Sequence, residues 1–268
     1  MKFTIVTISF NQAEFLERAI VSVINQKGVH VEYIIVDPGS TDGSREIIEK
    51  YRPHLAGVVY DRDDGPADGL NRGFALATGD VYGYLNSDDT FEPDAFFRVS
   101  RFLTEHPKLD VVCGHAWVID RHDKRLRRVW SETYNRIPVA YGAAVQIQPS
   151  TFIRQAAFRK TNGFNVENRS NWDGELLVDL FQSGAAIGVC DEFLSCYRLH
   201  EVSITNSGKL EELIAVWSRR RFEKLMKRPS QSFDDSMSTI LRLWKHLTHP
   251  RELMERLQYG PIYRRGAT

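Results

Sequence analysis

The chain has few cysteines, no net charge and no long apolar run. Three cysteines occur among 268 residues, without the spacing of a metal site or a disulfide framework, so we expect buried free thiols in a reducing compartment. The 35 basic and 35 acidic residues balance, which argues against a protein that binds nucleic acid through overall charge. No run approaches the length of a membrane span and no signal peptide precedes the first apolar segment. We therefore predict a cytoplasmic protein whose membrane contact, if present, is peripheral at the inner face.

The charge balance conceals an asymmetry along the chain. Residues 208–268 hold 13 Lys and Arg against 7 Asp and Glu, a net charge of +6, so residues 1–207 carry −6. Apolar residues of this basic segment, including Trp217 and Trp244, recur at helical spacing. We predict two parts: a domain at 1–207 and a basic, helical C-terminal extension at 208–268. The extension would cover the domain, form a homodimer or contact a membrane surface.

The first part alternates apolar runs with helical patterns, as βαβ units do. The predicted strands are 3–10, 31–36, 57–60 and 81–85, and the predicted helices are 14–24, 44–51 and 66–77. After residue 93 the alternation becomes irregular. A helix to residue 105 precedes strands at 109–119 and 125–130, a helix at 174–183 and two short extended segments at 187–190 and 194–197. This pattern predicts an α/β fold of Rossmann-like character, with a mixed sheet flanked by helices.

An acidic pair directly follows the predicted strand at 81–85, in the sequence NSDD of residues 86–89. Residues at the carboxyl end of a parallel strand face the crevice where α/β sheets bind ligands. The carboxylates of Asp88 and Asp89 are hard oxygen ligands that suit Mg²⁺ or Mn²⁺ bridging to phosphates. A surface turn is the alternative, since Asp and Asn are common in turns.

Further polar residues follow the other strands. Asp37 ends the strand at 31–36 and could accept a hydrogen bond from a nucleobase N–H, and the turn after it presents backbone N–H groups. Phe10 ends the first strand and could stack on a base, although an isolated aromatic residue is also typical of a core. Asn71, on the helix before the acidic pair, could bridge groups within the site.

Taken in order, these motifs resemble those of a family 2 glycosyltransferase with the GT-A nucleotide-sugar-binding fold. The resemblance covers about residues 3–205, with a donor-binding half at about 1–90 and an acceptor-binding half at about 91–207. It rests on TISFN at 7–11, VDPGSTDGS at 36–44, GLNRG at 69–73, ATGD at 77–80, LNSDD at 85–89, QPSTFIR at 148–154, GFN at 163–165, WD at 172–173 and YRLH at 197–200.

The resemblance implies roles for the donor-binding residues. Asp37 would pair with the base, commonly uracil or thymine, and Phe10 would stack on it. Asp88 and Asp89 would bind a divalent cation, Mn²⁺ or Mg²⁺, that bridges the donor diphosphate. Asn86 stands where many relatives have an acidic residue and would contact the ribose. Pro38 replaces a common Asp or Asn and alters the contacts beyond Asp37.

Two positions in the second half match residues close to the reaction. Asp173 matches the catalytic base, and it also suits the N-cap of the predicted helix at 174–183. His200 matches a position that helps to hold the metal or the diphosphate in some relatives; a structural histidine is the alternative. The polar segment 201–208 could form a lid over the donor.

These residues predict an inverting, metal-dependent hexosyltransferase. Its donor would be a nucleoside-diphosphate sugar, with UDP or dTDP favoured over GDP, and its acceptor a hydroxyl of a glycan or lipid-linked saccharide in surface polysaccharide biosynthesis. The alternatives are a nucleotidyltransferase-like enzyme, against which the absence of a Gly-rich basic loop at the first strand counts, and a non-catalytic nucleotide- or glycan-binding module.

Overall fold

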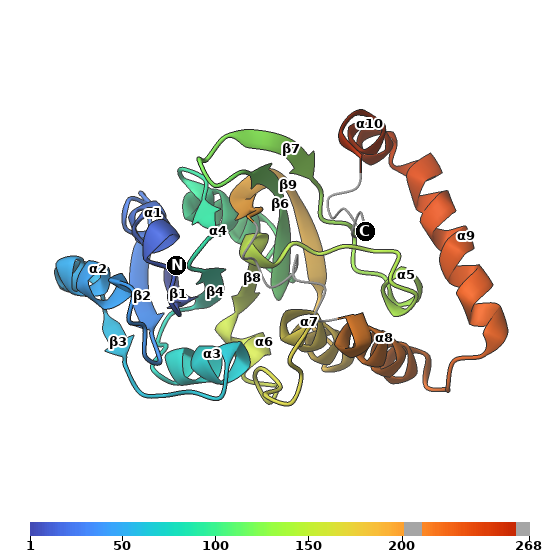
Figure 1. The fold of residues 1–268 in the computed structure, drawn as a ribbon. Helices are drawn as coiled ribbons and strands as arrows, with labels where there is room; N and C mark the ends of the chain where they lie inside the picture. Colours follow the sequence, from blue (N-terminus) through green and yellow to red (C-terminus); the bar gives the residue numbers. More distant parts are fainter. Residues whose placement is uncertain (201–210, 261–268) are drawn as a thin grey trace.

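The computed structural model describes residues 1–200 and 211–260. Its centre is a nine-stranded mixed sheet with strand order β3-β2-β1-β4-β8-β6-β9-β5, and β7 pairs with β6 outside this path. Helices cover both faces of the sheet (Figure 1). This arrangement confirms the predicted α/β fold with a mixed, helix-flanked sheet. The strands are β1 Lys2–Ile8, β2 His30–Val36, β3 Gly57–Val59, β4 Val81–Asn86, β5 Thr90–Phe91, β6 Val111–Ile119, β7 Arg125–Val129, β8 Thr151–Arg154 and β9 Ile187–Arg198.

The first four strands are parallel and place three chain segments at one edge. Ile8 at the end of β1 lies opposite Val36 of β2 on one side and Asn86 of β4 on the other. The residues that follow these strands therefore emerge side by side. Helices α1 Ala13–Ile24, α2 Ser44–Lys50 and α3 Pro66–Ala75 connect the strands, with a short 3₁₀ turn at Arg52–His54.

The second half mixes strand directions. Strand β8 is antiparallel to both β4 and β6, whereas β6 and β9 are parallel. Residues 187–198 form one strand of 12 residues, and not two short segments as predicted. The polar residues Asp191 and Glu192 interrupt the apolar pattern, but the pairing with β6 continues past them through register shifts near His115. The helices of this half are α4 Ala95–Glu105, α5 Arg136–Ala140, α6 Gln155–Phe158 and α7 Trp172–Gln182, and a 3₁₀ turn spans Gln148–Ser150.

The core lies in two layers, one on each face of the sheet. One layer packs α1 and α4 against the sheet through residues such as Leu16, Ile20 and Phe96. The other contains Leu70 and Phe74 of α3, residues of α7, and Trp217, Phe222 and Leu225 of the extension. All three cysteines are free and buried, as predicted.

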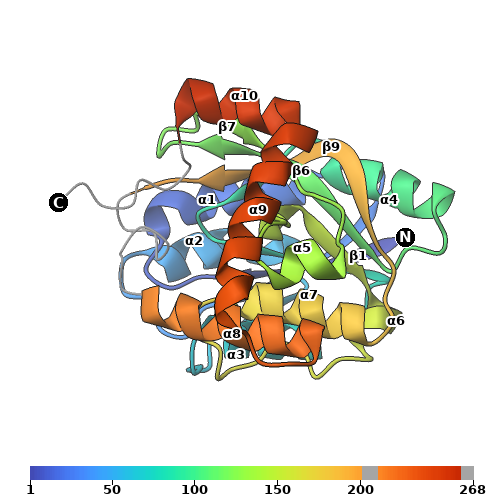
Figure 2. The ribbon, with the colours of Figure 1, turned by 90° about the vertical axis from the view of Figure 1, so that its right-hand side faces the viewer.

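The C-terminal extension packs on the second half of the domain, where α9 crosses in front of α5 (Figure 2). Its helices are α8 Glu211–Met226, α9 Ser232–Thr248 and α10 Pro250–Tyr259. A side-chain hydrogen bond fixes each helix to the domain. Lys224 donates to Glu175, the Tyr141 hydroxyl to Asp234, and Arg128 to Glu255, each at 2.7 Å. These contacts therefore agree with the prediction that the extension covers the domain. The predicted boundary at residues 207–208 and the predicted lid at 201–208 lie outside the described residues.

One face of α9 remains open to solvent. Five exposed large apolar side chains recur at intervals of four and three residues; we call them the α9 stripe, and they are Phe233, Met237, Ile240, Trp244 and Leu247, with Leu243 exposed beside them. None of the helices in the described parts of the chain has both the length and the apolar character needed to cross a membrane.

Candidate active site

Asp37 is fully buried where β2 ends, with one carboxylate oxygen satisfied and the other free. Oδ1 accepts hydrogen bonds from the backbone N–H groups of Gly39 and Ser40 at 3.1 and 2.8 Å and from Arg45 Nε at 3.2 Å. Oδ2 is buried and has no hydrogen-bond partner. An unpaired buried acceptor is costly, so a structure retains it where a ligand supplies the missing donor. The free oxygen suits the N–H of a base.

Phe10 is 58% exposed and lies beside the turn that follows Asp37. The backbone on each side of it is fixed, because Ser9 N donates to Val36 O at 2.9 Å and Asn11 N donates to Ser40 Oγ at 2.8 Å. The exposure rules out a core position for Phe10. Its ring is free to stack on a planar ligand at the edge where Asp37 lies.

The two aspartates after β4 differ in environment. The Asp89 side chain is buried, and its Oδ1 accepts the backbone N–H of Arg198 at 2.9 Å. Burial, followed by the neighbouring Asp88 charge, raises the pKa of Asp89 well above its ordinary value. The Asp88 side chain is 20% exposed, and its Oδ2 lies 3.0 Å from Nε2 of His200. Asp88 is therefore the carboxylate of the pair that a ligand can reach.

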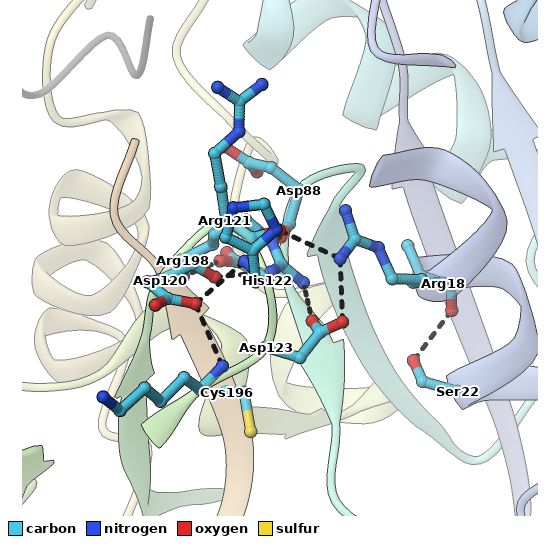
Figure 3. Close-up of polar contacts among 12 residues, drawn as sticks. Arg18, Ser22, Asp88, Asp120, Arg121, His122, Asp123, Cys196 and Arg198 are labelled. Carbon is cyan, nitrogen blue, oxygen red and sulfur yellow. Dashed lines mark hydrogen bonds and ion pairs between the residues drawn. The ribbon is translucent and has the colours of Figure 1, made fainter. Parts of the chain in front are cut away.

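Arg198 is a fully buried residue that fixes the acidic segment from behind. Its Nε donates to the Asp88 carbonyl oxygen at 2.7 Å, Nη1 to the Asp120 carbonyl at 2.7 Å, and Nη2 to the Asp123 carboxylate at 2.6 Å. Arg18 of α1 binds the other oxygen of Asp123 at 2.7 Å (Figure 3). The network joins the strand end, the turn after β6 and α1, which holds Asp88 in place.

Asp88 and His200 are the pair that could hold a divalent cation. In residues 1–200 and 211–260, no three or more His, Cys, Asp or Glu side chains form a group able to hold a metal by themselves. Mg²⁺ and Mn²⁺ do not require such a cage, because one or two protein ligands combine with substrate phosphates and water. The convergence of a reachable carboxylate and an imidazole on one point fits this chemistry.

The side-chain amides of Asn86 and Asn71 have different hydrogen-bond partners. Asn86 donates from Nδ2 to Gln148 Oε1 at 3.2 Å, and Gln148 donates from Nε2 to the Tyr84 carbonyl at 2.9 Å, so these residues link β4 to the 3₁₀ turn before β8. Asn71 exchanges two hydrogen bonds with the backbone of Phe164, at 2.8 and 2.9 Å. Asn71 therefore holds the loop after α6, and its predicted contact with the donor stays a prediction.

Asp173 lies in the first turn of α7 and lines a cavity of about 210 Å³. The helix begins at Trp172, so Asp173 follows the N-cap, Asn171, and is not the cap itself. Burial raises the pKa of Asp173, and a hydrogen bond from the backbone N–H of Gly174 partly offsets this effect. Gln148 and Tyr84 line the same cavity. A carboxylate with a raised pKa in a cavity is well suited to accept a proton.

The turn that carries Asp173 is braced by Glu175, two residues further along α7. Glu175 is buried; its Oε1 accepts from Lys224 Nζ of α8 at 2.7 Å, and its Oε2 accepts from Asn168 and Asn165 at 2.8 and 3.1 Å. Sequence reasoning missed Glu175 and Lys224, as well as Gln148 and Arg198 as site residues. The motifs QPSTFIR and YRLH contained a signal for the last two, but Glu175 and Lys224 stand 49 positions apart, and the chain between them carries no such signal.

The structure thus gathers the candidates into two neighbouring groups. Phe10, Asp37, Asp88, Asp89 and His200 follow the ends of β1, β2, β4 and β9. Asp173 lies in the cavity, which the Asn86–Gln148 hydrogen bond connects to the acidic segment. An open edge with polar strand-end residues next to a cavity that contains a partly buried carboxylate is an arrangement suited to group transfer between two substrates.

Comparison with known proteins identifies the class. The model of the family described as glycosyl transferase family 2 matches residues 4–162, more than half of the chain. The chain belongs to this family and is a glycosyltransferase with the GT-A fold. This finding confirms the predicted family and decides against the nucleotidyltransferase-like and non-catalytic alternatives.

Relatives extend the match. The PGL/p-HBAD biosynthesis glycosyltransferase of Mycobacterium bovis BCG is 35% identical over 189 residues, which are 69% of this chain and 72% of the relative. An uncharacterized glycosyltransferase of Nostoc sp. is 33% identical over 129 residues, 47% of this chain but only 40% of the relative.

Solved structures show the same fold at low identity. TarS of S. aureus, residues 1–349 in complex with UDP-GlcNAc, has a TM-score of 0.70 at 19% identity over 93% of this chain and 73% of that one. A mannosyltransferase of Pyrobaculum calidifontis in complex with GDP-Man and Mn²⁺ has a TM-score of 0.63 at 15% identity, over 96% and 73%.

Proposed function

We propose that this enzyme transfers a sugar from a nucleoside-diphosphate donor to a hydroxyl of a saccharide, with inversion at the anomeric carbon. The observation that carries this proposal is the position of Asp173, a partly buried carboxylate in a cavity whose wall residue Gln148 accepts a hydrogen bond from Asn86 of the acidic segment. One carboxylate would hold a cation that neutralises the leaving diphosphate, and the other would receive the proton of the acceptor. Two substrates can therefore meet between them.

The donor site is suited to a base with an imide N–H. The free Oδ2 of Asp37 accepts this N–H, and the exposed ring of Phe10 packs on the base. Pro38 has no backbone N–H, so the recognition depends on Asp37 itself. UDP and dTDP sugars fit, and the UDP-GlcNAc complex of TarS supports UDP as the first choice.

Asp88 and His200 would hold a divalent cation on the donor diphosphate. The cation would neutralise the charge of the leaving group as a Lewis acid. Arg198 and Asp89 keep the acidic segment in position, because their hydrogen bonds fix its backbone and that of β9. The Mn²⁺ in the mannosyltransferase complex supports this use of the fold.

Asp173 acts as the general base. Its carboxylate takes the proton from the acceptor hydroxyl as the oxygen bonds to the anomeric carbon, and this assistance contributes roughly 10²–10⁴-fold to the rate. A direct displacement with one base inverts the anomeric centre, because no second carboxylate of the described cavity lining serves as a nucleophile.

The relatives support the acceptor class. They include glycosyltransferases of teichuronic acid biosynthesis in Bacillus subtilis and of PGL/p-HBAD biosynthesis in mycobacteria, and a succinoglycan biosynthesis protein of Rhizobium meliloti. We place this enzyme in surface polysaccharide or glycolipid biosynthesis, with a glycan or lipid-linked saccharide as the acceptor.

The test is a panel of UDP, dTDP and GDP sugars with and without Mn²⁺, read by melting temperature and by release of nucleoside diphosphate. A donor above its dissociation constant should raise the melting temperature only with the matching base, and release should require the cation. Asp37→Asn should lose the donor effect, whereas Asp235→Asn on the exposed surface of α9 should keep it. The proposal is wrong if no nucleotide sugar of the panel shifts the melting temperature of the intact chain.

The α9 stripe suggests a partner for the extension. Its intervals of four and three residues are those with which two helices pack side by side. We propose that a second copy of the chain covers the α9 stripe, rather than a membrane surface, since the stripe follows the spacing of a helix–helix seam along most of α9.

A further inference from the structure

The cavity beside Asp173 has a cationic wall that belongs to the extension. Arg221 of α8 lines this cavity together with Asp173, Gln148 and Tyr134. The Arg221 side chain is partly buried, and its Nε is fully buried without a hydrogen-bond partner. The hydroxyl of Tyr134 is likewise buried and unpaired. Two polar groups in one cavity thus lack the partners that buried polar groups normally have.

A second guanidinium group stands next to the first. Gly142, with a φ of +64°, follows α5, and a β-carbon built on it would lie 2.7 Å from Nη2 of Arg221 and 3.6 Å from Nη2 of Arg242. Among the described residues, neither arginine has an ion pair or a side-chain hydrogen bond. Burial lowers the pKa of Arg221, and the charge of Arg242 lowers it further.

Other inward-facing cations of the extension have acidic partners, so the lack of one at Arg221 in the described part of the chain is a local exception. Lys224 is paired with Glu175 and Asp179, Arg228 with Asp234, and Lys245 with Glu132 and Glu252, all at 3.1 Å or less. Each of these three inward-facing cations therefore has an acidic partner. Arg221 loses solvation because it is partly buried, and the neighbouring exposed Arg242 repels it, so an anion bound beside them would relieve both costs.

We propose that this cavity binds an oxyanion of the acceptor saccharide, a carboxylate or a phosphate ester, through Arg221 and the hydroxyl of Tyr134, with Arg242 as a second cation next to Arg221. Planar guanidinium groups bind both oxyanions in a bidentate manner. The anionic group would hold the acceptor so that a nearby hydroxyl reaches Asp173. The placement of that hydroxyl rests on the function proposed above; the binding of the anion does not.

The experiment is a calorimetric titration of the full chain at low salt, without and with UDP and Mn²⁺. The probes are methyl glucuronide, methyl glucoside 6-phosphate and neutral methyl glucoside, so the first two separate the sources of the oxyanion. Variants are Arg221→Gln, Arg221→Lys and, as a matched control, Arg220→Gln, whose side chain is exposed on the same helix. We expect wild type to bind at least one anionic probe about tenfold or more tightly than the neutral one.

Arg221→Gln should lose that preference, Arg221→Lys should retain part of it, and Arg220→Gln should retain all of it. Equal affinity of wild type for charged and neutral probes would overturn the proposal, as would an unchanged preference in folded Arg221→Gln. The titration without nucleotide keeps this result separate from the function proposed above. Failure to bind any donor would refute that function, whereas anion binding by the free protein would still stand.

Discussion

Asp173 illustrates how a single residue balances stability against function. It is ionised only at a cost, since burial raises the pKa of its carboxyl group in the folded state. The folded state therefore holds this proton more tightly than the unfolded chain, and ionisation above the ordinary carboxyl pKa destabilises the fold. A proton acceptor in a cavity requires this cost.

We predict that Asp173→Asn lowers turnover by about 10²–10⁴-fold and leaves the affinity for donor nearly unchanged. Because Asn carries no charge to bury, the melting temperature at pH 7 should stay level or rise. The measurements are nucleoside diphosphate release, donor titration and thermal unfolding. Asp179→Asn, on the same helix but paired with Lys224, is the matched control and should keep turnover while losing some stability. Turnover above half the wild-type rate in Asp173→Asn would remove this residue from the mechanism.

Most of what the sequence could predict about the site comes from the residues that follow the parallel strands. The apolar runs at β1, β2 and β4 and the parallel pairing they favour place Asp37 and Asp88 at one edge, and the structure has them there. The details escaped prediction, because they depend on long-range contacts. Neither the burial of Asp89 against the backbone of Arg198 nor the continuous β9 can be read from local pattern.

The same sheet contains an acidic residue whose effect depends on pH. Glu32 of β2 accepts hydrogen bonds from Lys2 Nζ at 2.6 Å, Thr4 Oγ1 at 2.5 Å and Thr78 N at 2.7 Å, joining β1, β2 and the turn before β4. Burial alone would raise the pKa of Glu32, but these hydrogen bonds outweigh it and hold the pKa at about 2, below the ordinary 4.5. The stabilisation is thus complete above about pH 4.5 and is lost as the pH falls towards 2.

We predict that Glu32→Gln lowers the free energy of unfolding by about 1–3 kcal/mol at pH 7, a range discounted for the partial exposure of Lys2. The difference from wild type should shrink as the pH falls from 4.5 to 2. Urea unfolding at a series of pH values provides the measurement. Glu105→Gln, which removes an exposed carboxylate of α4, should show almost no difference. A pH-independent loss for Glu32→Gln would contradict the assignment.

At the scale of the molecule, the extension is part of the enzyme's architecture. The spacing of its apolar residues predicted its helices, and its composition predicted its basic character. Neither predicted that α8 would contact the turn carrying Asp173 or line its cavity. Sequence could not show this, because the contacts join residues far apart in the chain. For the α9 stripe, the sequence predicted apolar residues at helical spacing, but it did not predict that these residues lie on a face exposed to solvent.

We predict that the intact chain is a dimer and that Trp244→Glu makes it a folded monomer, since Trp244 is 63% exposed in the single chain. Sedimentation equilibrium over a range of concentrations provides the measurement, and Thr239→Glu, at an exposed polar position of α9, is the control. A monomer at every concentration would refute the dimer. Binding of wild type to anionic vesicles, lost in Trp244→Glu, would then assign the α9 stripe to a lipid surface.

The ion pair between Lys224 and Glu175 has a consequence for engineering. A chimera that receives the α/β portion from one enzyme and the C-terminal extension from another would separate these two partners. The strand ends that carry Asp37 and Asp88 would survive such a graft, but the helix that carries Asp173 would lose its contact with Lys224. An exchange of acceptor preference between relatives should therefore transplant α7 and α8 as one unit.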